Sequence, residues 1–329
     1  MTAMIATIEF IALCAASFFL TRAVRRELLR RDLLDVPNHR SSHTVPVPRG
    51  GGLAVIAVLL PAWAVISLLF PVPGHALAIV AGAVAVAVLS LMDDLKGLGA
   101  GRRLLIQAVA VGAGLFALPE GSLTNGWLPL VVERILVFFA WLWFVNLYNF
   151  MDGIDGITGT QTIFLCLGLG VFAAVADQQG TVLLSVAVAA SVAGFLVLNW
   201  HPAKIFLGDV GSVTLGYLLG WLLLSLAIGG DWAAALIIPA YYLADATITL
   251  ASRALRGEKL AQAHREHFYQ KAAKGIGSHA KVVGVIAVGN AAFLAIAVGL
   301  TQRPVSALIL AAAALSATLA VLVWMARRA

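Results

Sequence analysis

The sequence predicts an all-α membrane protein that crosses the bilayer about eleven times. Of its 329 residues, 61% are hydrophobic and only 12% are charged, and the mean hydropathy is +0.96. Soluble domains average about 25% charged residues, so a chain this apolar lacks the polar groups to cover a water-facing surface. One crossing takes about 20 apolar helical residues, and about eleven crossings account for roughly two thirds of the chain. We therefore expect a single integral membrane domain over residues 1–329 and no large soluble domain.

Eleven apolar runs, each bounded by charged or turn residues, are the expected crossings. In chain order they cover residues 4–21, 52–70, 75–92, 104–118, 130–148, 158–176, 181–198, 212–229, 233–250, 282–300 and 305–325. The first run is followed by the basic residues Arg22, Arg25 and Arg26, with no small-residue cleavage site, and is interpreted as a retained anchor. Cys14 and Cys166 lie in apolar runs and are expected to be packed there, since two cysteines are too few for a disulfide scaffold.

The basic residues predict the orientation of the chain. Alternating the runs across the bilayer places 20 of the 22 Lys and Arg residues on one side and leaves only Arg134 and Arg303 on the other. Because short cytoplasmic loops retain Lys and Arg, the basic side is expected to be the cytoplasm, with the N-terminus outside and the C-terminus in the cytoplasm. The net charge of +6 is thereby explained by topology, and no nucleic-acid partner is predicted.

Most other polar side chains fall on the same cytoplasmic side. Of 16 acidic residues, only Glu9 and Asp245 lie well inside a run, and six of the seven histidines are cytoplasmic, His75 being the exception. This layout is typical of an active site at the membrane interface. A secondary transporter would be expected to carry ionisable residues near the bilayer midplane, and it remains the alternative from a different functional class.

The first cytoplasmic loop, residues 35–52, contains three prolines and ends in Arg49 followed by the glycines Gly50 to Gly52. Glycines at a helix start leave backbone N–H groups open to an anion, and Arg40 and Arg49 lie beside them in sequence. The loop is therefore a candidate phosphate cradle. An ordinary basic loop with a glycine turn explains the same residues.

Two adjacent carboxylates, Asp93 and Asp94, end the third apolar run, and Arg102 and Arg103 follow. Adjacent carboxylates repel each other, so they persist where a cation, a basic partner or water offsets their charge. The arginines are suited to a substrate phosphate, or they follow the positive-inside tendency. A solvated helix end is the alternative interpretation of the whole segment.

The segment from Asn146 to Gly156 is the most specific string in the chain. Asn146, Asn149, Asp152 and Asp155 recur every third residue, so on a helix they would form a polar stripe. The glycine after each aspartate allows the backbone to unwind around a ligand. Carboxylate and amide oxygens suit Mg²⁺ rather than zinc, whereas a hydrated helix end is the alternative.

Two later loops contain further candidates. Asp209 is flanked by glycines at a helix start, where an aspartate serves as a metal ligand or as an N-cap, and Phe206 nearby is suited to stack on a base. In the last loop, residues 251–281, His264 and His267 lie one helical turn apart in basic surroundings that suit phosphates. A basic helix facing lipid headgroups is the alternative there.

Together, four strings resemble those of the polyprenyl-phosphate N-acetylhexosamine-1-phosphate transferase superfamily. They are Asp93-Asp94, Asn146 to Gly156, Phe206 to Ser212 and the histidine-containing last loop. The resemblance implies ten or eleven transmembrane helices around a cytoplasmic cleft in the bacterial inner membrane. It also implies transfer of a sugar 1-phosphate from a UDP-N-acetylhexosamine to undecaprenyl phosphate, with release of UMP and with Mg²⁺, or Mn²⁺ in its place, as the cofactor.

The resemblance implies a role for each matching residue. The implied metal ligands are Asn149 and Asp209; the residues around the reacting phosphates are Asp93, Asp94, Asp152 and Asp155; and those that hold substrate are Arg49, Arg103, Asn199, Phe206, His264, Arg265 and His267. The last loop reads His-Arg-Glu-His where the peptidoglycan branch has consecutive histidines, so the branch that starts O-antigen and related polysaccharides is expected and the UDP-MurNAc-pentapeptide branch is the alternative. The sequence leaves open the choice between GlcNAc and a 6-deoxy N-acetyl sugar, and also the oligomeric state, a homodimer included.

Overall fold

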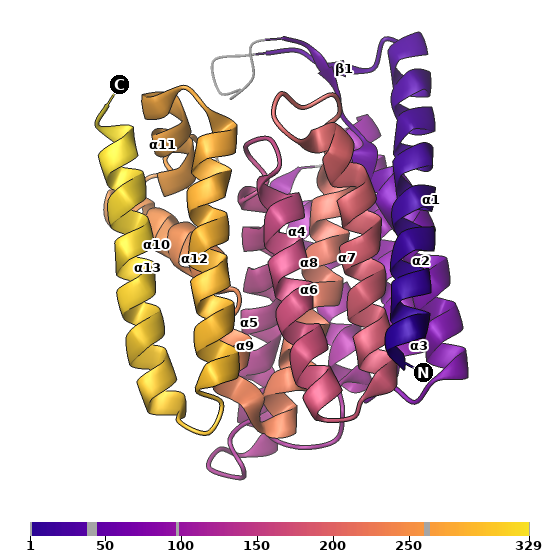
Figure 1. Cartoon of the computed structure of the whole chain (residues 1–329), viewed down its shortest axis with the longest axis vertical. Helices are drawn as coiled ribbons and strands as arrows, with labels where there is room; N and C mark the ends of the chain where they lie inside the picture. Colours follow the sequence, from indigo (N-terminus) through magenta and orange to yellow (C-terminus); the bar gives the residue numbers. More distant parts are fainter. Residues whose placement is uncertain (1, 38–44, 97–98, 260–263, 329) are drawn as a thin grey trace.

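The computed structural model describes residues 2–37, 45–96, 99–259 and 264–328. Arg40, His39 and His43 of the first loop lie outside the described residues. In the described part the chain forms a bundle of helices packed side by side (Figure 1). Helices suit a bilayer because each one pairs its own backbone N–H and C=O groups, which find no water in the hydrocarbon region.

The elements follow one another along the chain with short connections. The helices are α1 (Thr2–Arg30), α2 (Gly51–Leu69), α3 (Ala76–Lys96), α4 (Ala100–Gly114), α5 (Leu130–Phe150), α6 (Ile157–Val175), α7 (Gln179–Asn199), α8 (Asp209–Leu226), α9 (Trp232–Ile237), α10 (Ala240–Leu255), α11 (Phe268–Ile276), α12 (His279–Gly299) and α13 (Pro304–Ala326). Two helical turns, η1 (Leu115–Ala117) and η2 (Ala227–Asp231), continue α4 and α8. Two short antiparallel strands, β1 (Leu34–Asp35) and β2 (Val47–Pro48), pair beside the start of α2.

Nine helical segments among the described residues are long and apolar enough to cross a membrane. They match nine of the eleven expected runs, with 209–237 as one continuous segment. The expected run 104–118 corresponds to α4, whose 15 residues span about 22 Å, less than a bilayer core. The chain is thus a multi-pass membrane protein, and the total of eleven crossings stays a prediction.

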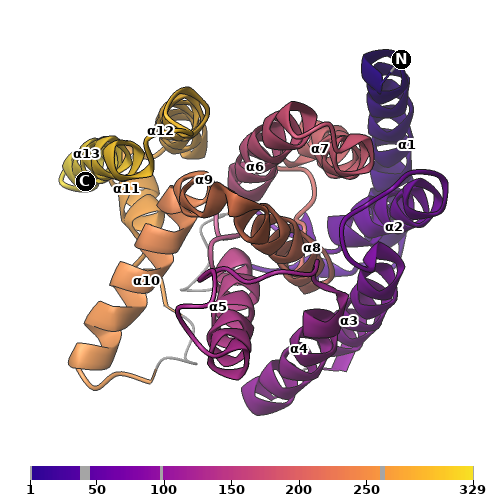
Figure 2. The same cartoon turned by 90° about the horizontal axis from the view of Figure 1, so that it is seen from below.

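The expected continuous helix over residues 233–250 is wrong. α9 ends at Ile237 and α10 begins at Ala240, with Pro239 between them. A proline ring has no N–H to donate and clashes with the preceding helical turn, so it breaks the helix here. Seen along the long axis, most helices appear end-on, whereas α10 is seen from the side as it runs out of the bundle (Figure 2).

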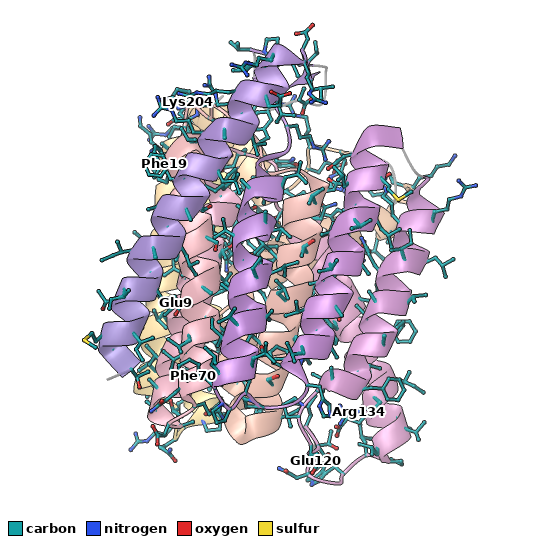
Figure 3. The ribbon with its side chains drawn as sticks, turned by 90° about the vertical axis from the view of Figure 1, so that its right-hand side faces the viewer. Glu9, Phe19, Phe70, Glu120, Arg134 and Lys204 are labelled. Carbon is teal, nitrogen blue, oxygen red and sulfur yellow. The ribbon has the colours of Figure 1, made fainter. Side chains whose placement is uncertain are left out.

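Lys204 and Arg134, which the sequence predicts on opposite sides of the membrane, lie at opposite ends of the bundle (Figure 3). The two termini lie at opposite ends of the long axis (Figure 1), as an odd number of crossings requires. Lys204 lies at one end, and Arg134 lies with Glu120 at the other (Figure 3). The structure therefore agrees with the predicted alternation of the loops, while the assignment of the Lys204 end to the cytoplasm stays a prediction.

The core is built around α8. Every residue from Asp209 to Leu223 is buried. The indole N–H of Trp141 donates to the Tyr217 carbonyl oxygen at 3.0 Å, and the two rings stack with centroids 5.0 Å apart. Burying a tryptophan in an apolar bundle is favourable only when its N–H finds an acceptor, which for Trp141 is the Tyr217 carbonyl oxygen. Cys166 is buried in this core and Cys14 is half-buried, and both are free thiols.

Close packing of α1 against α7 depends on Gly194. A Cβ atom at Gly194 would lie 2.2 Å from the Cys14 carbonyl oxygen, whereas a Cβ at Gly284 of α12 would meet nothing within 4 Å. We expect Gly194→Ala to push α1 away and to lower the thermal unfolding midpoint in detergent by several degrees, since overpacking costs about 1–3 kcal/mol. Gly284→Ala is the matched control, and its midpoint should stay unchanged or rise. Equal midpoints for the two variants would contradict this packing.

Candidate functional site

Three carboxylates and two guanidinium groups meet at the Lys204 end of the bundle. Arg103 Nη1, from the first turn of α4, lies 3.4 Å from Asp93 Oδ2 and 3.4 Å from Asp209 Oδ2. Arg49, just before α2, lies 3.5 Å from Asp94 Oδ1 and pairs with Asp209. Two positive and three negative groups leave one net negative charge. We call these five residues the aspartate–arginine cluster.

The glycine before Asp209 allows this cluster to form. Gly208 has a φ of 79°, which strongly favours glycine, and a Cβ there would lie 3.4 Å from Asp94 Oδ2. With no side chain in the way, the Asp94 carboxylate reaches the first turn of α8 and accepts a hydrogen bond from the Val210 N–H. Asp94 therefore caps α8, while Asp209 occupies the first turn, where the helix dipole favours a negative charge.

The glycines of the first loop do not form the expected phosphate cradle. The N–H groups of Gly50 and Gly51 donate to the Phe206 carbonyl oxygen at 3.0 and 2.8 Å, and the Gly52 N–H donates to the Leu207 carbonyl oxygen at 2.8 Å. A Cβ at Gly52 would lie 2.3 Å from a backbone nitrogen of α8. These glycines thus serve close packing between α2 and α8, and their donors are already used.

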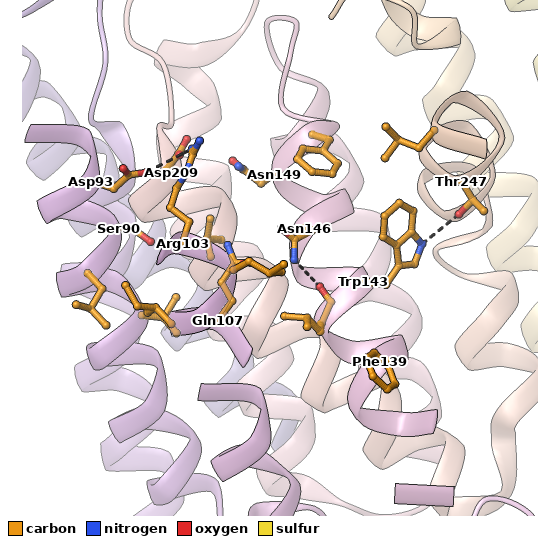
Figure 4. Close-up of a pocket in the computed structure, with 18 of the residues that line it drawn as sticks. Ser90, Asp93, Arg103, Gln107, Phe139, Trp143, Asn146, Asn149, Asp209 and Thr247 are labelled. Atoms are coloured by element: carbon orange, nitrogen blue, oxygen red, sulfur yellow. Dashed lines mark hydrogen bonds and ion pairs between the residues drawn. The ribbon is translucent and has the colours of Figure 1, made fainter. Parts of the chain in front are cut away.

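Three residues of the cluster, Asp93, Arg103 and Asp209, line one end of a cavity of about 590 Å³. Its walls come from α3, α4, α5, α8 and α10, and most of its lining side chains are apolar, including Val86, Leu104, Leu142 and Leu250. Figure 4 shows Asp93, Asp209, Arg103 and Asn149 gathered at one end, with Phe139 and Trp143 farther away. A space that is charged at one end and apolar along its walls suits a molecule with a polar head and an apolar tail.

Asn149 and Asp209, the two expected metal ligands, both line this cavity. Ser212, one turn beyond Asp209 on α8, donates to Asn149 Oδ1 at 2.6 Å and joins α5 to α8. Ser212 had no predicted role, although its place at i+3 from Asp209 puts both residues on one helix face.

The donor set at this end of the cavity fits a magnesium ion. The cavity is lined there by carboxylate oxygens of Asp93 and Asp209 and by the Asn149 amide, and Mg²⁺ prefers oxygen ligands. The arginines that now pair with the carboxylates have side chains 44% and 42% exposed, so both have solvent to move into when a divalent cation competes. The opposing charges raise the pKa of Arg49 although its burial acts to lower it.

Asp152 follows α5 and is half-buried beside the cluster. Burial raises the pKa of this carboxyl to about 6, although a hydrogen bond with Thr158 and the charge of Arg49 act to lower it. The pKa of Asp152 is therefore shifted toward neutral pH, and that of Asp94 is also raised by burial.

The structure places Asp155 in a different environment. Its Oδ2 lies 2.6 Å from His201 Nδ1 and 3.2 Å from His279 Nδ1, and it accepts the Ala203 N–H at 3.1 Å. Burial acts to raise the pKa of Asp155, but the hydrogen bonds from His279 and His201 outweigh it and lower the pKa. Asp155 is not one of the described residues that line the cavity. Its expected place beside the reacting phosphates stays a prediction.

Asn199 and Phe206 hold the loop between α7 and α8. Asn199 is 5% exposed; its Oδ1 accepts the Gly156 N–H at 3.0 Å and its Nδ2 donates to the Ile205 carbonyl at 2.9 Å. Phe206 is half-buried, and its backbone pairs with Arg49 in a parallel bridge. These two bonds use one of the two N–H donors and one of the two oxygen lone pairs of the Asn199 amide, and its expected contact with a nucleotide stays a prediction.

The last loop is fixed by a buried carboxylate. His267 is 2% exposed and its Nδ1 lies 3.0 Å from Asp245 Oδ1, while Asp245 also accepts the N–H groups of Phe268 and Tyr269 at the start of α11. His267 is therefore buried in the core, whereas the sequence predicted that it contacts substrate. Asp245 was noticed in the sequence only as an acid inside an apolar run.

His264 and Arg265 are more accessible than His267. His264 is half-buried and Arg265 is exposed. Burial, with the neighbouring charges of His267 and Arg253, lowers the pKa of His264 to about 4. A neutral imidazole offers hydrogen bonds but no charge to a phosphate, so Arg265 is the stronger candidate of the two for an anionic ligand.

The amino-acid sequence is similar over most of its length to transferases. Residues 76–227, from α3 to the end of α8, match glycosyl transferase family 4. A Streptomyces coelicolor protein named as a glycosyltransferase is 33% identical over 299 residues, 86% of this chain and 68% of that protein. A Bacillus subtilis protein named as an undecaprenyl-phosphate N-acetylglucosaminyl 1-phosphate transferase is 29% identical over 296 residues, 86% of this chain and 81% of that protein. A Streptococcus thermophilus phospho-N-acetylmuramoyl-pentapeptide-transferase is 30% identical over 240 residues, 66% of this chain and 68% of that protein.

Asp152 and Asp155 should respond oppositely to removal of their charge. The folded state raises the pKa of Asp152 to about 6, so the stability linked to its proton is present at pH 4 and is lost as the pH rises through 6. We expect Asp152→Asn to raise the unfolding midpoint by roughly 3 °C at pH 7.5, with the gain shrinking toward pH 5. Asp155→Asn removes a carboxylate whose pKa is lowered, and the midpoint at pH 7.5 should fall. Shifts of the same sign at pH 7.5 would contradict this assignment.

Proposed function

This chain belongs to the polyprenyl-phosphate sugar-1-phosphate transferases of glycosyl transferase family 4, and from that membership we propose that it transfers an N-acetylhexosamine 1-phosphate. The donor is a UDP-sugar, the acceptor is undecaprenyl phosphate and the released product is UMP. The names of the relatives support this proposal, because the Bacillus subtilis protein is named for undecaprenyl phosphate and N-acetylglucosamine 1-phosphate.

The shape and charge of the cavity carry the proposal. A polyprenyl phosphate has one charged headgroup at the membrane surface and a long apolar chain in the bilayer, and the cavity has one charged end and apolar walls. A nucleotide sugar stays in water, so the two substrates meet only at the surface of the membrane. Asp209 of the aspartate–arginine cluster begins α8, directly after the loop that contains Lys204, which supports an active site on the cytoplasmic face of the bacterial inner membrane.

Asn149 and Asp209, with Asp93 beside them, would hold Mg²⁺, which when bound neutralises charge on the pyrophosphate and on departing UMP. The protein's own residues then bind and orient the phosphates. Arg49 and Arg103 have planar forks of N–H donors that match phosphate oxygens, and both already lie within 4 Å of the carboxylates they would leave. Positioning of the two substrates against each other supplies much of the remaining rate.

The acceptor needs little help from a general base. A phosphate monoester has a second pKa of about 6, so the lipid phosphate is mostly a dianion at pH 7. The alternative is attack on phosphorus by an aspartate of the chain. Asp93 pairs with Arg103, and Asp94 caps α8 and pairs with Arg49, so both carboxylates are engaged in the folded site. When the arginines move to the phosphates, the Val210 N–H still engages Asp94, which favours direct attack by the lipid phosphate over attack by Asp94.

The structure of the last loop supports a proposal about which sugar is transferred. Its arrangement places His267 against Asp245 and leaves His264 and Arg265 toward solvent, with one basic group for a donor phosphate. We propose an N-acetylhexosamine without a peptide, which starts O-antigen or a related envelope polysaccharide. UDP-MurNAc-pentapeptide is the second candidate, because the Streptococcus thermophilus relative is named for that substrate. Transport is not favoured, since the ionisable residues of the cavity gather at one end of it.

Asp209 is the residue whose loss should affect catalysis most. Asp209→Asn removes a charge that both arginines and the proposed ion share, and we expect turnover to fall at least about 100-fold. The assay follows UMP release from a panel of UDP-sugars with undecaprenyl phosphate, after EDTA treatment and with Mg²⁺ restored. Asp231→Asn, whose carboxylate lies just before α9, away from the cluster, is the control and should retain activity. A folded Asp209→Asn protein with near-normal turnover would exclude the metal role.

The cavity wall is tested on α5, which carries a matched pair of leucines. Leu142 lines the cavity, whereas Leu136 is 55% exposed and outside it. We expect Leu142→Trp to raise the KM for undecaprenyl phosphate several-fold, because the larger ring occupies space that the lipid chain would take. The KM for the UDP-sugar should change little, and Leu136→Trp should change neither. A rise confined to the UDP-sugar KM would mean that the cavity holds the donor instead.

A further inference from the structure

Two buried hydroxyl groups connect α10 to the carboxylate of Asp152. The Tyr242 hydroxyl, from α10, lies 3.3 Å from Thr158 Oγ1 in the first turn of α6, and the Thr158 side chain is hydrogen-bonded to Asp152. Tyr242 is 0% exposed and Thr158 is 1% exposed, and neither is one of the described residues that line the cavity. Within the part of the chain that the structure describes, both residues therefore reach the site through Asp152.

The direction of these hydrogen bonds follows from the number of protons. An ionised carboxylate only accepts hydrogen bonds, so the Thr158 hydroxyl donates its single proton to Asp152. The Tyr242 hydroxyl is then the donor to Thr158 Oγ1, because the proton of Thr158 is already in use. Donation by Tyr242 polarises the Thr158 O–H bond and strengthens its contact with the carboxylate. Tyr242 and Thr158, which we call the hydroxyl pair, thus donate one after the other toward Asp152.

Two further hydroxyls fix the backbone at Thr158. The Thr162 hydroxyl donates to the Thr158 carbonyl oxygen at 2.6 Å, and the Tyr148 hydroxyl, from α5, lies 2.5 Å from Thr162 Oγ1. The rings of Tyr148 and Tyr242 pack with their centroids 5.3 Å apart. One turn of α6 is therefore tied to both α5 and α10, and all four of these residues are buried. Because unpaired hydroxyls are costly to bury, these bonds specify where the Thr158 side chain lies.

We propose that Thr158 and Tyr242 are positioning residues, which hold the Asp152 carboxylate for the transfer reaction without touching substrate. The inference rests on the proposed function, because it takes Asp152 to lie beside the reacting phosphates. Arg49 and Asp209 of the aspartate–arginine cluster lie near enough for their charges to act on Asp152. Asp152 lies in the short loop between α5 and α6 and is followed by a glycine, so side-chain contacts are needed to fix its orientation. The bond from Thr158 restricts that orientation, and misplacement of a group at a reacting centre slows the chemical step.

The helix that carries Tyr242 also forms part of the cavity wall. Tyr242 lies in the first turn of α10, directly after the break at Pro239, and the same helix lines the cavity with residues from Thr247 to Ala254. One element therefore bounds the space proposed for the acceptor and holds a carboxylate beside the charged end of that space. Removing the Tyr242 hydroxyl tests the second of these contributions while leaving the lining residues of α10 unchanged.

Substitutions that each remove one hydroxyl from the full-length protein test the proposal. Thr158→Val keeps the shape of the side chain, and its kcat for UMP release from a UDP-sugar and undecaprenyl phosphate should fall at least about tenfold, because the carboxylate loses its donor. The KM values of both substrates should change less than about twofold, as expected for residues that act on the chemical step and not on binding. Tyr242→Phe should lower kcat several-fold. Thr158→Ser, which keeps the hydroxyl, should restore the wild-type kcat.

Buried hydroxyls on α8 supply the controls. Thr214 Oγ1 is buried without a hydrogen-bond partner among the described residues, and the Tyr217 ring stacks on Trp141, so Thr214→Val and Tyr217→Phe should leave kcat unchanged.

A double substitution shows whether Thr158 acts through Asp152. In an Asp152→Asn background, Thr158→Val should lower kcat no further, because the carboxylate that it positions is gone. With an active wild type, equal kcat for Thr158→Val and Thr158→Ser, or additive losses in the double variant, would overturn this inference alone. A wild type that releases no UMP from any UDP-sugar would instead overturn the proposed function, and with it the premise of the inference.

Discussion

Mutual repulsion of three carboxylates is the constraint around which this site is organised. Asp93 and Asp94 of α3 are brought together with Asp209 of α8, and two arginines offset most of the charge of these three residues. Because each arginine touches two of the aspartates, neither helix end can move far without separating an ion pair. The remaining negative charge and the exposure of both guanidinium groups leave the cluster ready to exchange an arginine contact for a divalent cation or a phosphate.

The loops above the cluster are held by buried polar side chains rather than by apolar packing. Asn199 joins the loop after α5 to the loop after α7, and Asp245 fixes the start of α11. Tyr269 of α11 donates to the Phe150 carbonyl at 3.1 Å, which ties α11 to the end of α5. Each of these groups would be costly to bury unpaired, so each contact specifies one loop arrangement over its alternatives.

Local sequence predicted what depends on local chemistry. Hydropathy located most crossings because each helix must satisfy its backbone within the bilayer, and the resemblance of four strings identified the family. Local sequence did not show which distant segments of the chain lie against each other. A run of glycines before a helix fits an anion site and close helix packing equally well. The structure shows close packing, because the glycine N–H groups donate to Phe206 and Leu207 and because α8 lies against Gly52.

The contacts of the histidines could not be predicted from their spacing in the sequence either. His264 and His267 are neighbours in sequence, yet one is half-buried in the loop and the other is sealed against Asp245. His201 and His279 are far apart in sequence, and no sequence pattern indicated that either pairs with Asp155. Spacing along a chain predicts helix neighbours, but a loop-borne cluster depends on how the helices beneath it pack.

The break at Pro239 explains how a tightly packed bundle contains so large a cavity. α10 leaves the bundle after the break, and its residues from Thr247 to Ala254 form the wall opposite α3 and α4. Trp143 of α5 donates to Thr247 Oγ1 at 3.2 Å across this space, which fixes the distance between α5 and α10. Asp245, six residues after the break, joins α10 to the start of α11 through its contacts with His267, Phe268 and Tyr269, so the wall is held by a polar network. The break thus sets the position from which Thr247 to Ala254 of α10 line the cavity.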